Sequence, residues 1–433
     1  MYEGKAHKPP ALALSLSTLP TSPGIQGQGA SPPKYALVAW LSLIGALLPS
    51  RELSINAGVN FTPGRICIIL LLIPALVNLL SKAVRPTWSD FFVFATGAWI
   101  LVAACYTKGA EALLSAAGGE SLEFVGAYMV GRAFLWHPAA LRNFVHVLGI
   151  VSIILVLFAL ADRISGEWII ENTLASIVNV VPAGANFRNG VIRATASLDH
   201  PILLGAFLSL ASALIIYSNE GVISRSFYLV SNLFGCVLSL SSASLMTWAM
   251  IVSSYLYDQL LSTFSRRWGL FWVVVGALGC TIFLVTNAPL GWLITHLTLD
   301  PQSGYFRYLI WDAALARIQE SPWTGYAFNR LNDDILDTTV DSVWLVNALR
   351  FGVPTVAFLL LANISAAWPA RRTGSGPDDA GFSGRMNTGF SIMLLMFMFI
   401  GLTVHYWNYM WIFWGLCLGI KVSLKQSLMA RRS

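Results

Sequence analysis

Runs of apolar residues, each long enough to cross a lipid bilayer, recur along almost the whole chain and are separated by short polar turns. Of the 433 residues, 56% are hydrophobic and only 11% are charged, and the mean hydropathy is +0.66. These values lie outside the range of soluble globular domains. Because a hydrocarbon core about 30 Å thick needs roughly 20 apolar residues, the sequence predicts an all-α polytopic membrane protein with about twelve transmembrane helices.

The apolar runs define the expected organisation. The predicted helices lie near residues 35–50, 66–81, 90–106, 121–137, 143–162, 201–217, 226–240, 242–261, 268–288, 351–368, 388–404 and 405–421. We therefore divide the chain into a membrane domain at 35–289, which includes an outward segment at 163–200, a large loop at 290–350, and a second group of membrane helices at 351–421. The proline-rich residues 1–34 predict a disordered tail, and residues 422–433 predict a second tail.

Lysine and arginine set the expected orientation, because short loops rich in them stay in the cytoplasm. Basic residues such as Lys82, Arg142, Arg225, Arg266 and Arg371 fall in alternate turns. This pattern predicts that both termini are cytoplasmic and that the loop at 290–350 is extracytoplasmic. The formal net charge of +6 is spread over these turns, so it indicates topology and contact with anionic lipid rather than a nucleic-acid partner.

Motifs for several kinds of chemistry are missing from the sequence. It contains no Walker loop, no dinucleotide-binding glycine pattern and no HExxH motif. The five cysteines lie in apolar segments without neighbouring histidines, which does not fit a zinc site. We expect no metal and no cofactor.

The first outward segment ends just before a predicted helix that starts at Pro201. Proline suits a first helical position, so His200 is interpreted as the residue that begins this helix. Gly205, one turn later, predicts close approach of a neighbouring helix. Arg193 is expected at the membrane surface, where it contacts either headgroup phosphate or the phosphate of a substrate.

The large loop contains its own helical pattern. Arg307, Trp311 and further residues recur at helical spacing, which predicts an amphipathic helix over Gly304–Ser321 that ends at Pro322. A turn is expected at residues 322–326. Asp341 stands where the chain returns to the membrane.

Acidic residues gather between that turn and Asp341. We interpret Asp333, Asp334 and Asp337 as a solvated acidic face, with a divalent-cation site or a general base as alternatives.

A series of short motifs follows one order along residues 185–365. It comprises Arg193, His200-Pro201, Gly205, the Ser239–Ser244 turn, Arg307, Trp311, Pro322, Gly325, the Val340-Asp341-Ser342 run, Leu345 and Gly352. In this order and on this side of the predicted membrane, the series resembles the superfamily of O-antigen ligases and Wzy-type polysaccharide polymerases. The valine-aspartate form of the run before Ser342 is similar to the branch of exopolysaccharide polymerases. Many relatives carry an arginine after the serine of the Ser-rich turn, and this chain lacks it.

The resemblance implies a glycosyltransferase of the bacterial inner membrane. Such enzymes take a glycan linked to undecaprenyl diphosphate on the outer face and transfer it to an acceptor hydroxyl, without nucleotide sugar or metal. By resemblance, Arg193 and Arg307 bind the diphosphate and neutralise its charge, and Arg350 is a third candidate. Asp341 occupies the place of a histidine of the ligases, which makes it the expected general base. His200 and Trp311 are further candidate substrate-binding residues.

Three functions remain open at this point. The leading hypothesis is a polymerase that joins lipid-linked repeat units into exopolysaccharide or O-antigen, with membrane lipid and a chain-length-regulating co-polymerase as candidate partners. The second is a ligase that passes glycan to lipid A core or protein. The third is a flippase or other carrier, which the scarcity of ionisable residues inside the helices disfavours. The exceptions, Glu123 and Arg132, are expected to reach water from the ends of their helix.

Overall fold

The computed structural model describes residues 33–430 apart from 57–59, 83, 115, 183, 219–220, 287–291, 293–300 and 369–378. The predicted N-terminal tail therefore lies outside the described residues, except for its last two, which begin the first helix.

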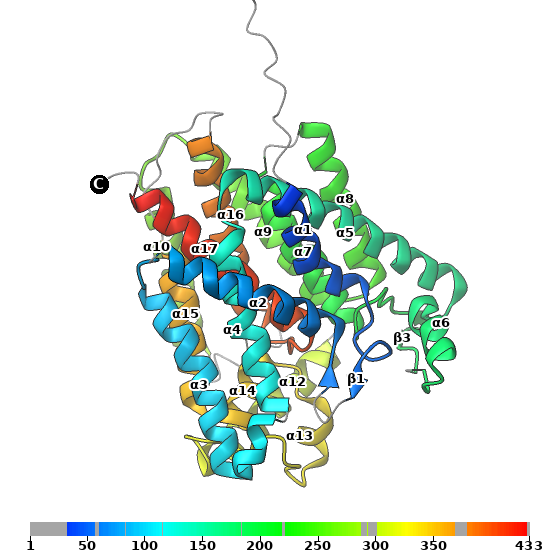
Figure 1. The fold of residues 1–433 in the computed structure, drawn as a ribbon. Coiled ribbons are helices and arrows are strands. Elements are labelled where there is room, and N and C mark those ends of the chain that lie inside the picture. Colours follow the sequence, from blue (N-terminus) through cyan, green and yellow to red (C-terminus); the bar gives the residue numbers. More distant parts are fainter. Residues whose placement is uncertain are drawn as a thin grey trace, which may run out of the picture.

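The described chain is mostly helical (Figure 1). Its α-helices are α1 (Pro33–Leu43), α2 (Pro63–Ser81), α3 (Trp88–Lys108), α4 (Ala116–Phe134), α5 (Pro138–Ser165), α6 (Ile169–Val178), α7 (Pro201–Ile216), α8 (Val222–Leu238), α9 (Ser242–Leu260), α10 (Arg267–Val285), α12 (Pro301–Glu320), α13 (Asp334–Thr339), α14 (Val343–Phe351), α15 (Val353–Ala367), α16 (Asp379–Ile400) and α17 (Tyr409–Ala430). Two 3-10 helices, η1 (Ile44–Leu47) and η2 (Ala110–Leu114), complete the helical elements.

Two short antiparallel hairpins interrupt the helices. β1 (Ile55–Asn56) pairs with β2 (Asn60–Phe61), and β3 (Phe187–Arg188) pairs with β4 (Val191–Ile192). In the second hairpin Phe187 lies opposite Ile192, and Arg188 lies opposite Val191.

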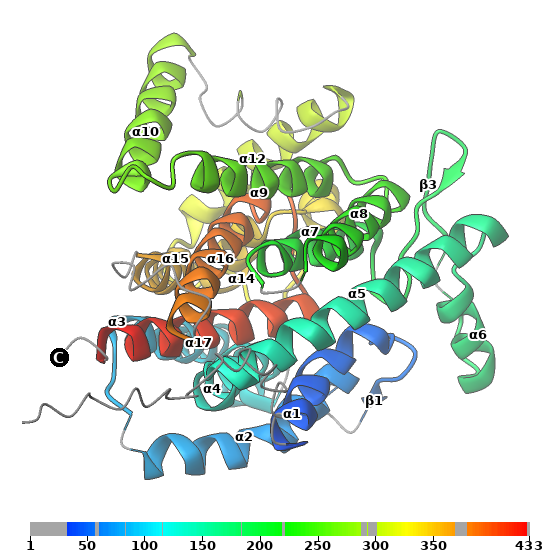
Figure 2. The ribbon, with the colours of Figure 1, turned by 90° about the horizontal axis from the view of Figure 1, so that it is seen from above.

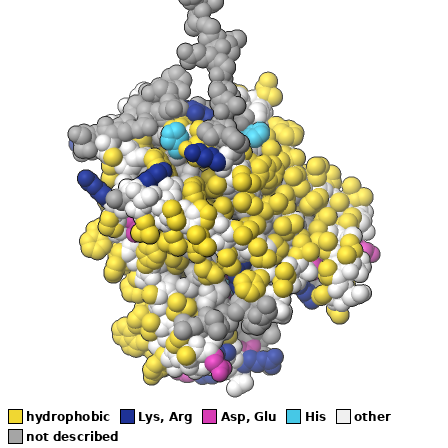
Figure 3. Space-filling model, in the orientation of Figure 1, with side chains coloured by type: hydrophobic (Ala, Val, Ile, Leu, Met, Phe, Trp, Pro, Cys, Tyr) yellow, Lys and Arg dark blue, Asp and Glu magenta, His cyan; other side chains and the backbone are white. Residues whose placement is uncertain are grey.

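The helices support a membrane protein. Within the described residues, α2, α3, α5 and α10 are long and apolar enough to cross a bilayer, and shorter apolar helices include α7, α8 and α15. Hydrophobic side chains cover much of the middle of the molecule in Figure 3, whereas most of the charged side chains visible there lie toward its two ends. α10 stands at the edge of the molecule in Figure 2, and most of its side chains are exposed. Such a surface suits contact with lipid tails.

The predicted helices and the observed helices differ in their boundaries. The last predicted pair, 388–404 and 405–421, is found at 379–400 and 409–430, with a turn at 401–408 between them. Residues 422–430, which were assigned to the C-terminal tail, therefore continue α17. The outward segment at 163–200 also contains α6 and the β3–β4 hairpin, neither of which was predicted.

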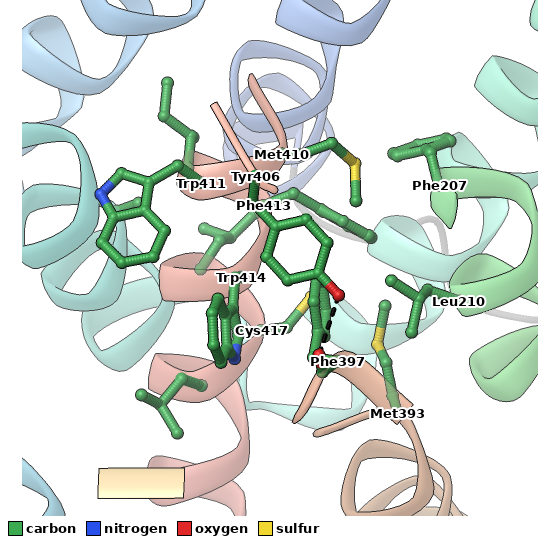
Figure 4. Packing of buried hydrophobic residues seen from close by; sticks show 14 of the residues in the cluster. Phe207, Leu210, Met393, Phe397, Tyr406, Met410, Trp411, Phe413, Trp414 and Cys417 are labelled. Atoms are coloured by element: carbon green, nitrogen blue, oxygen red, sulfur yellow. Dashed lines mark hydrogen bonds between the residues drawn. The ribbon is translucent and has the colours of Figure 1, made fainter. Parts of the chain in front are cut away.

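The centre of the bundle is the crossing of α17 with α4. A side chain added at Gly415 or Gly419 would collide with backbone oxygens of Phe124 and Tyr128, so the two helices touch at their backbones. Around this crossing, large side chains from α7, α16 and α17 pack together, and the hydroxyl of Tyr406 donates to the Phe397 carbonyl at 2.8 Å (Figure 4). Trp414 is fully buried in this cluster.

Buried ion pairs link neighbouring helices. Arg132 of α4 contacts Asp90 of α3 at 2.8 Å and is 3% exposed, and Glu123 of α4 contacts Arg65 of α2 at 3.0 Å and is 2% exposed. The prediction that Arg132 and Glu123 reach water is therefore wrong, because each is enclosed by protein and paired with an opposite charge. Asp258 and Arg267 form a third buried pair at 2.7 Å.

Buried ionisable groups are consequently more frequent than the sequence suggested. Lys421 of α17 is also fully buried and donates to the backbone and side-chain oxygens of Asn387. The sequence argument against a carrier assumed that the helix interiors are nearly free of charged residues, and the structure does not support that assumption. Most of these groups nevertheless lie in the first or last turns of their helices and are neutralised in pairs.

One end of the bundle carries α12 and α13, and we call it the loop end (Figure 1). A helix is found where one was predicted at Gly304–Ser321: it is α12, and the turn after Pro322 is also confirmed. This turn docks on the break between α14 and α15: Tyr326 N donates to Leu349 O at 2.7 Å, and Val353 N donates to Pro322 O at 2.8 Å. Gly352 has φ of 83° at this break and has no room for a side chain.

Candidate active site

Arg193 is held in place by backbone contacts at the loop end. It follows strand β4, and its backbone carbonyl accepts from Trp168 Nε1 at 2.8 Å. Its side chain is 7% exposed, and its Nε donates to Ser239 O at 3.2 Å. The Ser-rich turn of the sequence is thus a direct neighbour of Arg193. This contact brings two of the predicted motifs together.

A second arginine, which the sequence analysis did not select, approaches the same turn. Arg188 lies in β3, and its Nη1 donates to Leu240 O at 2.8 Å. Asn189 and Gly190 have φ of 51° and 73°, as a two-residue hairpin turn requires. The Asn-Gly pair between two short runs was the signal that could have predicted this hairpin and the position of Arg188.

The loop that follows Arg193 is organised by Asp162 at the end of α5. Its two carboxylate oxygens accept from the backbone N–H groups of Ile169, Thr195 and Ala196, at 3.0, 3.2 and 2.9 Å. A fully buried carboxylate needs such partners, and here they fix the course of the loop.

The predicted helix start at His200 is confirmed. His200 caps α7, and its Nδ1 accepts from Ile202 N at 3.2 Å. Burial first, and the charge of Arg193 second, lower the pKa of His200 to about 4. At neutral pH the ring is therefore uncharged and carries its proton on Nε2, so it is suited to donating a hydrogen bond and not to removing a proton.

Gly205 allows the close approach that the sequence predicted. A side chain at this position would collide with the hydroxyls of Ser239 and Ser244, so α7 packs directly on the Ser-rich turn. The turn is thereby fixed between α7 and Arg193.

Asp341 shares the electrostatic environment of the two predicted arginines. It is half-buried, and burial raises the pKa of its carboxyl above the usual range, while Arg307 and Arg193 oppose that shift. For Arg193, burial, Arg188 and Arg307 lower the pKa to about 10, against the opposing charge of Asp341. Arg188, Arg193, Arg307 and Asp341 thus form one group of interacting charges, which we call the arginine group.

Arg307 and Trp311 lie one turn apart on α12 but face different surroundings. The charge of Arg307 acts on Asp341 and Arg193. Trp311 packs against an apolar cluster formed by residues such as Ile310, Ala314 and Leu345. Trp311 therefore takes part in the packing of α12 against the rest of the loop end.

Arg350 has a different partner from the one expected. Its Nη1 contacts Glu120 Oε1 of α4 at 2.6 Å, and its guanidinium lies over the ring of Phe328 at 4.7 Å. Arg350 therefore joins α14 to α4 through an ion pair.

The other acidic residues have separate roles. Asp333 caps α13 by accepting from Ile335 N and Leu336 N, and Asp337 accepts from Leu331 N at 2.7 Å. The Asp334 side chain lies outside the described part of the structure. Within that part, no group of acidic, histidine and cysteine side chains is arranged to hold a metal ion.

Asp199 is the remaining carboxyl near the site. Its Oδ2 accepts from Asn408 Nδ2 at 3.0 Å, and burial raises its pKa to about 6.

The arrangement suits an anion with two negatively charged groups. Three guanidinium groups and one carboxylate give a net positive charge, and guanidinium groups bind phosphate oxygens in pairs of hydrogen bonds. A carboxyl whose pKa is raised by burial can remove a proton at neutral pH. The site thus combines an anion-binding half with a candidate base.

Comparison with known proteins adds no family assignment: no family model matches the chain, and no curated protein matches it.

Proposed function

We propose that this protein is a membrane glycosyltransferase that polymerises oligosaccharide repeat units linked to undecaprenyl diphosphate, on the outer face of the bacterial inner membrane. The observation that carries the proposal is the arginine group. Arg193, Arg307 and Asp341 come from separate segments of the chain, yet their charges interact at one end of the bundle. They are the residues that the resemblance to Wzy-type polymerases singles out.

The donor half of the reaction follows from charge. When the glycosidic C–O bond to the lipid diphosphate breaks, negative charge develops on the leaving oxygen. Arg193 and Arg307 are cationic at neutral pH and lower the energy of that charge. Each charge-assisted hydrogen bond contributes about 1.5–3 kcal/mol. Arg188 adds positive charge beside Arg193.

The acceptor half requires removal of one proton. A hydroxyl of the acceptor sugar attacks the anomeric carbon, and Asp341 takes the hydroxyl proton as the new C–O bond forms. The raised pKa of Asp341 strengthens it as a base, and the two arginines keep it ionised. The products are an extended glycan and undecaprenyl diphosphate.

The lipid-linked saccharides of a strain that lacks the protein provide the test. Their size and their side of the membrane should be compared after complementation with the wild type, Arg193→Ala or Arg307→Ala. We expect single repeat units to accumulate on the outer face without the protein and with either variant. Long lipid-linked chains on the outer face would instead indicate a ligase, and units confined to the inner face would indicate a flippase.

Protein level controls this experiment, because a variant that fails to insert also makes no polymer. Polymer of normal length in either arginine variant, at the protein level of the wild type, would refute the assignment of that residue.

A further inference from the structure

A polar cavity of about 440 Å³ lies beside His200 and Asp199, because its lining residue Trp407 is 5.9 Å from the His200 ring and its lining residue Asn408 donates to Asp199. The β1–β2 hairpin and the first turns of α2, α4 and α17, together with α14 and the 401–408 turn, line it. Its walls include Glu120, Glu123, Asn347, His405, Trp407 and Trp411. This volume is within the range of small-molecule sites, which is about 300–1,000 Å³.

The charges around the cavity are balanced. Glu120 is paired with Arg350 at 2.6 Å, and Glu123 is paired with Arg65 at 3.0 Å. These pairs leave no excess charge for an ionic ligand. The arginine group, with three guanidinium groups and one carboxylate, differs in this respect. The cavity is therefore suited to an uncharged polar ligand.

Two buried polar atoms in the cavity wall can accept a hydrogen bond. Among the residues that the structure describes, neither Asn347 Oδ1 nor His405 Nδ1 has a hydrogen-bond partner, although Asn347 Nδ2 donates to Val343 O at 2.8 Å. Unsatisfied buried acceptors are costly in free energy, and a ligand that donates hydrogen bonds removes that cost. Burial and the charge of Arg350 lower the pKa of His405, so its ring is uncharged and offers a lone pair.

Aromatic rings form the apolar part of the cavity wall. The rings of Trp407 and His405 are 5.3 Å apart, and Trp411 stacks on Phe124 at 4.6 Å with its Nε1 bonded to Glu120 O. Flat indole faces contact the C–H face of a sugar ring, while hydrogen-bond acceptors bind its hydroxyls. A cavity without net charge that combines hydrogen-bond acceptors, carboxylates and indole rings is suited to binding a saccharide.

The cavity is joined to the arginine group by short links. Val343 N donates to the carbonyls of Gly401 and Val404 at 3.1 and 3.0 Å, so the turn that carries His405 is bonded to the chain two residues after Asp341. Trp407 lies 5.9 Å from the ring of His200, whose pKa is affected by Arg193.

We propose that this cavity binds an uncharged saccharide unit, with Asn347 and His405 accepting hydrogen bonds from its hydroxyls and Trp407 contacting its ring. That this saccharide is the acceptor glycan rests on the proposed function. That the cavity binds a saccharide rests only on the residues that line it.

Binding to the full-length protein in lipid nanodiscs tests the proposal. One probe is the oligosaccharide released by mild acid from the strain's lipid-linked intermediates, followed by saturation-transfer NMR. The second probe is inorganic pyrophosphate, followed by phosphorus NMR. We expect His405→Phe and Trp407→Leu to weaken saccharide binding at least tenfold and to leave pyrophosphate binding unchanged. Trp323→Leu is the matched control, because this tryptophan is 71% exposed at the loop end.

Three results would overturn the proposal: no saccharide binding by the wild type, unchanged saccharide binding in both cavity variants, or loss of pyrophosphate binding in both. The last would make the cavity a part of the anion site. Size-exclusion elution and the thermal midpoint verify that each variant is folded. Arg307→Ala separates the two proposals. It should lose pyrophosphate and keep saccharide. Polymer formation by this variant would refute the role of Arg307 in the proposed function and would leave the saccharide site in the cavity unaffected.

Discussion

A buried glutamate next to the candidate site makes stability depend on pH. Glu171 of α6 is 3% exposed, and its Oε1 has no hydrogen-bond partner among the described residues. Burial, reinforced by the charge of nearby Glu52, raises its pKa from 4.5 to about 8. The folded protein therefore keeps the proton between these two values, whereas the unfolded chain releases it. Stability falls as pH rises through this window.

The size of the effect follows from the two pKa values. Each unit of pKa corresponds to about 1.4 kcal/mol, so the stability lost between pH 4.5 and 8 is roughly 5 kcal/mol, of which about 3 kcal/mol is lost by pH 7. Glu171→Gln keeps the shape of the side chain and cannot ionise. We expect the variant to match the wild type at pH 4.5 and to be more stable at pH 8.

Thermal unfolding in detergent, followed by tryptophan fluorescence at several pH values, measures this difference. Glu167→Gln is the control, because Glu167 is exposed on the same segment and its replacement should leave the thermal midpoint unchanged. An equal decline of the midpoint from pH 5 to pH 8 in wild type and Glu171→Gln would refute the reasoning.

Three further predictions concern the site and the core. Transfer by the wild type should fall as pH drops through the raised pKa of Asp341, and Asp341→Asn should lose most of the rate while Asp341→Glu keeps part of it; a rate independent of pH would contradict the role as base. Gly419→Val should abolish folded protein in detergent extracts because α4 leaves no room, whereas Gly276→Val, in open space, should not. Asn387→Leu should cost about 1–3 kcal/mol in thermal or denaturant unfolding, because it removes the side-chain acceptor of the buried Lys421 Nζ and leaves only the backbone carbonyl; Lys421→Met, which removes the amine itself, should cost less.

Helix starts and stops could be predicted because their signals are local. Pro201 marks the start of α7, and Pro322 lies two residues after the end of α12, so both boundaries are within a residue or two of the expected positions. Arg193, Arg307 and Asp341 were selected through a resemblance in motif order, and the structure brings their charges together.

The cavity could not be predicted in the same way. Glu120 of α4 and His405 of the turn before α17 are far apart in the sequence, and the crossing of α4 with α17 brings them to one wall. No local pattern distinguishes Asn347 from other polar residues of an apolar helix. Arg350 was selected by resemblance as a third phosphate-binding candidate, and its ion pair with Glu120 could not be predicted because the two residues are just as distant in the sequence.

The ion pairs of α4 have a consequence for biogenesis. α2 and α3 are synthesised before α4, and until α4 arrives Arg65 and Asp90 have no counter-charge from it. An unpaired charge costs about 2.5–3.5 kcal/mol at the centre of an inserting helix, and Arg65 and Asp90, each the third residue of its helix, meet a smaller cost near the membrane surface. α4 carries both missing partners, Glu123 about midway along the helix and Arg132 in its last turn. Its insertion therefore neutralises a charge on each of two earlier helices at once.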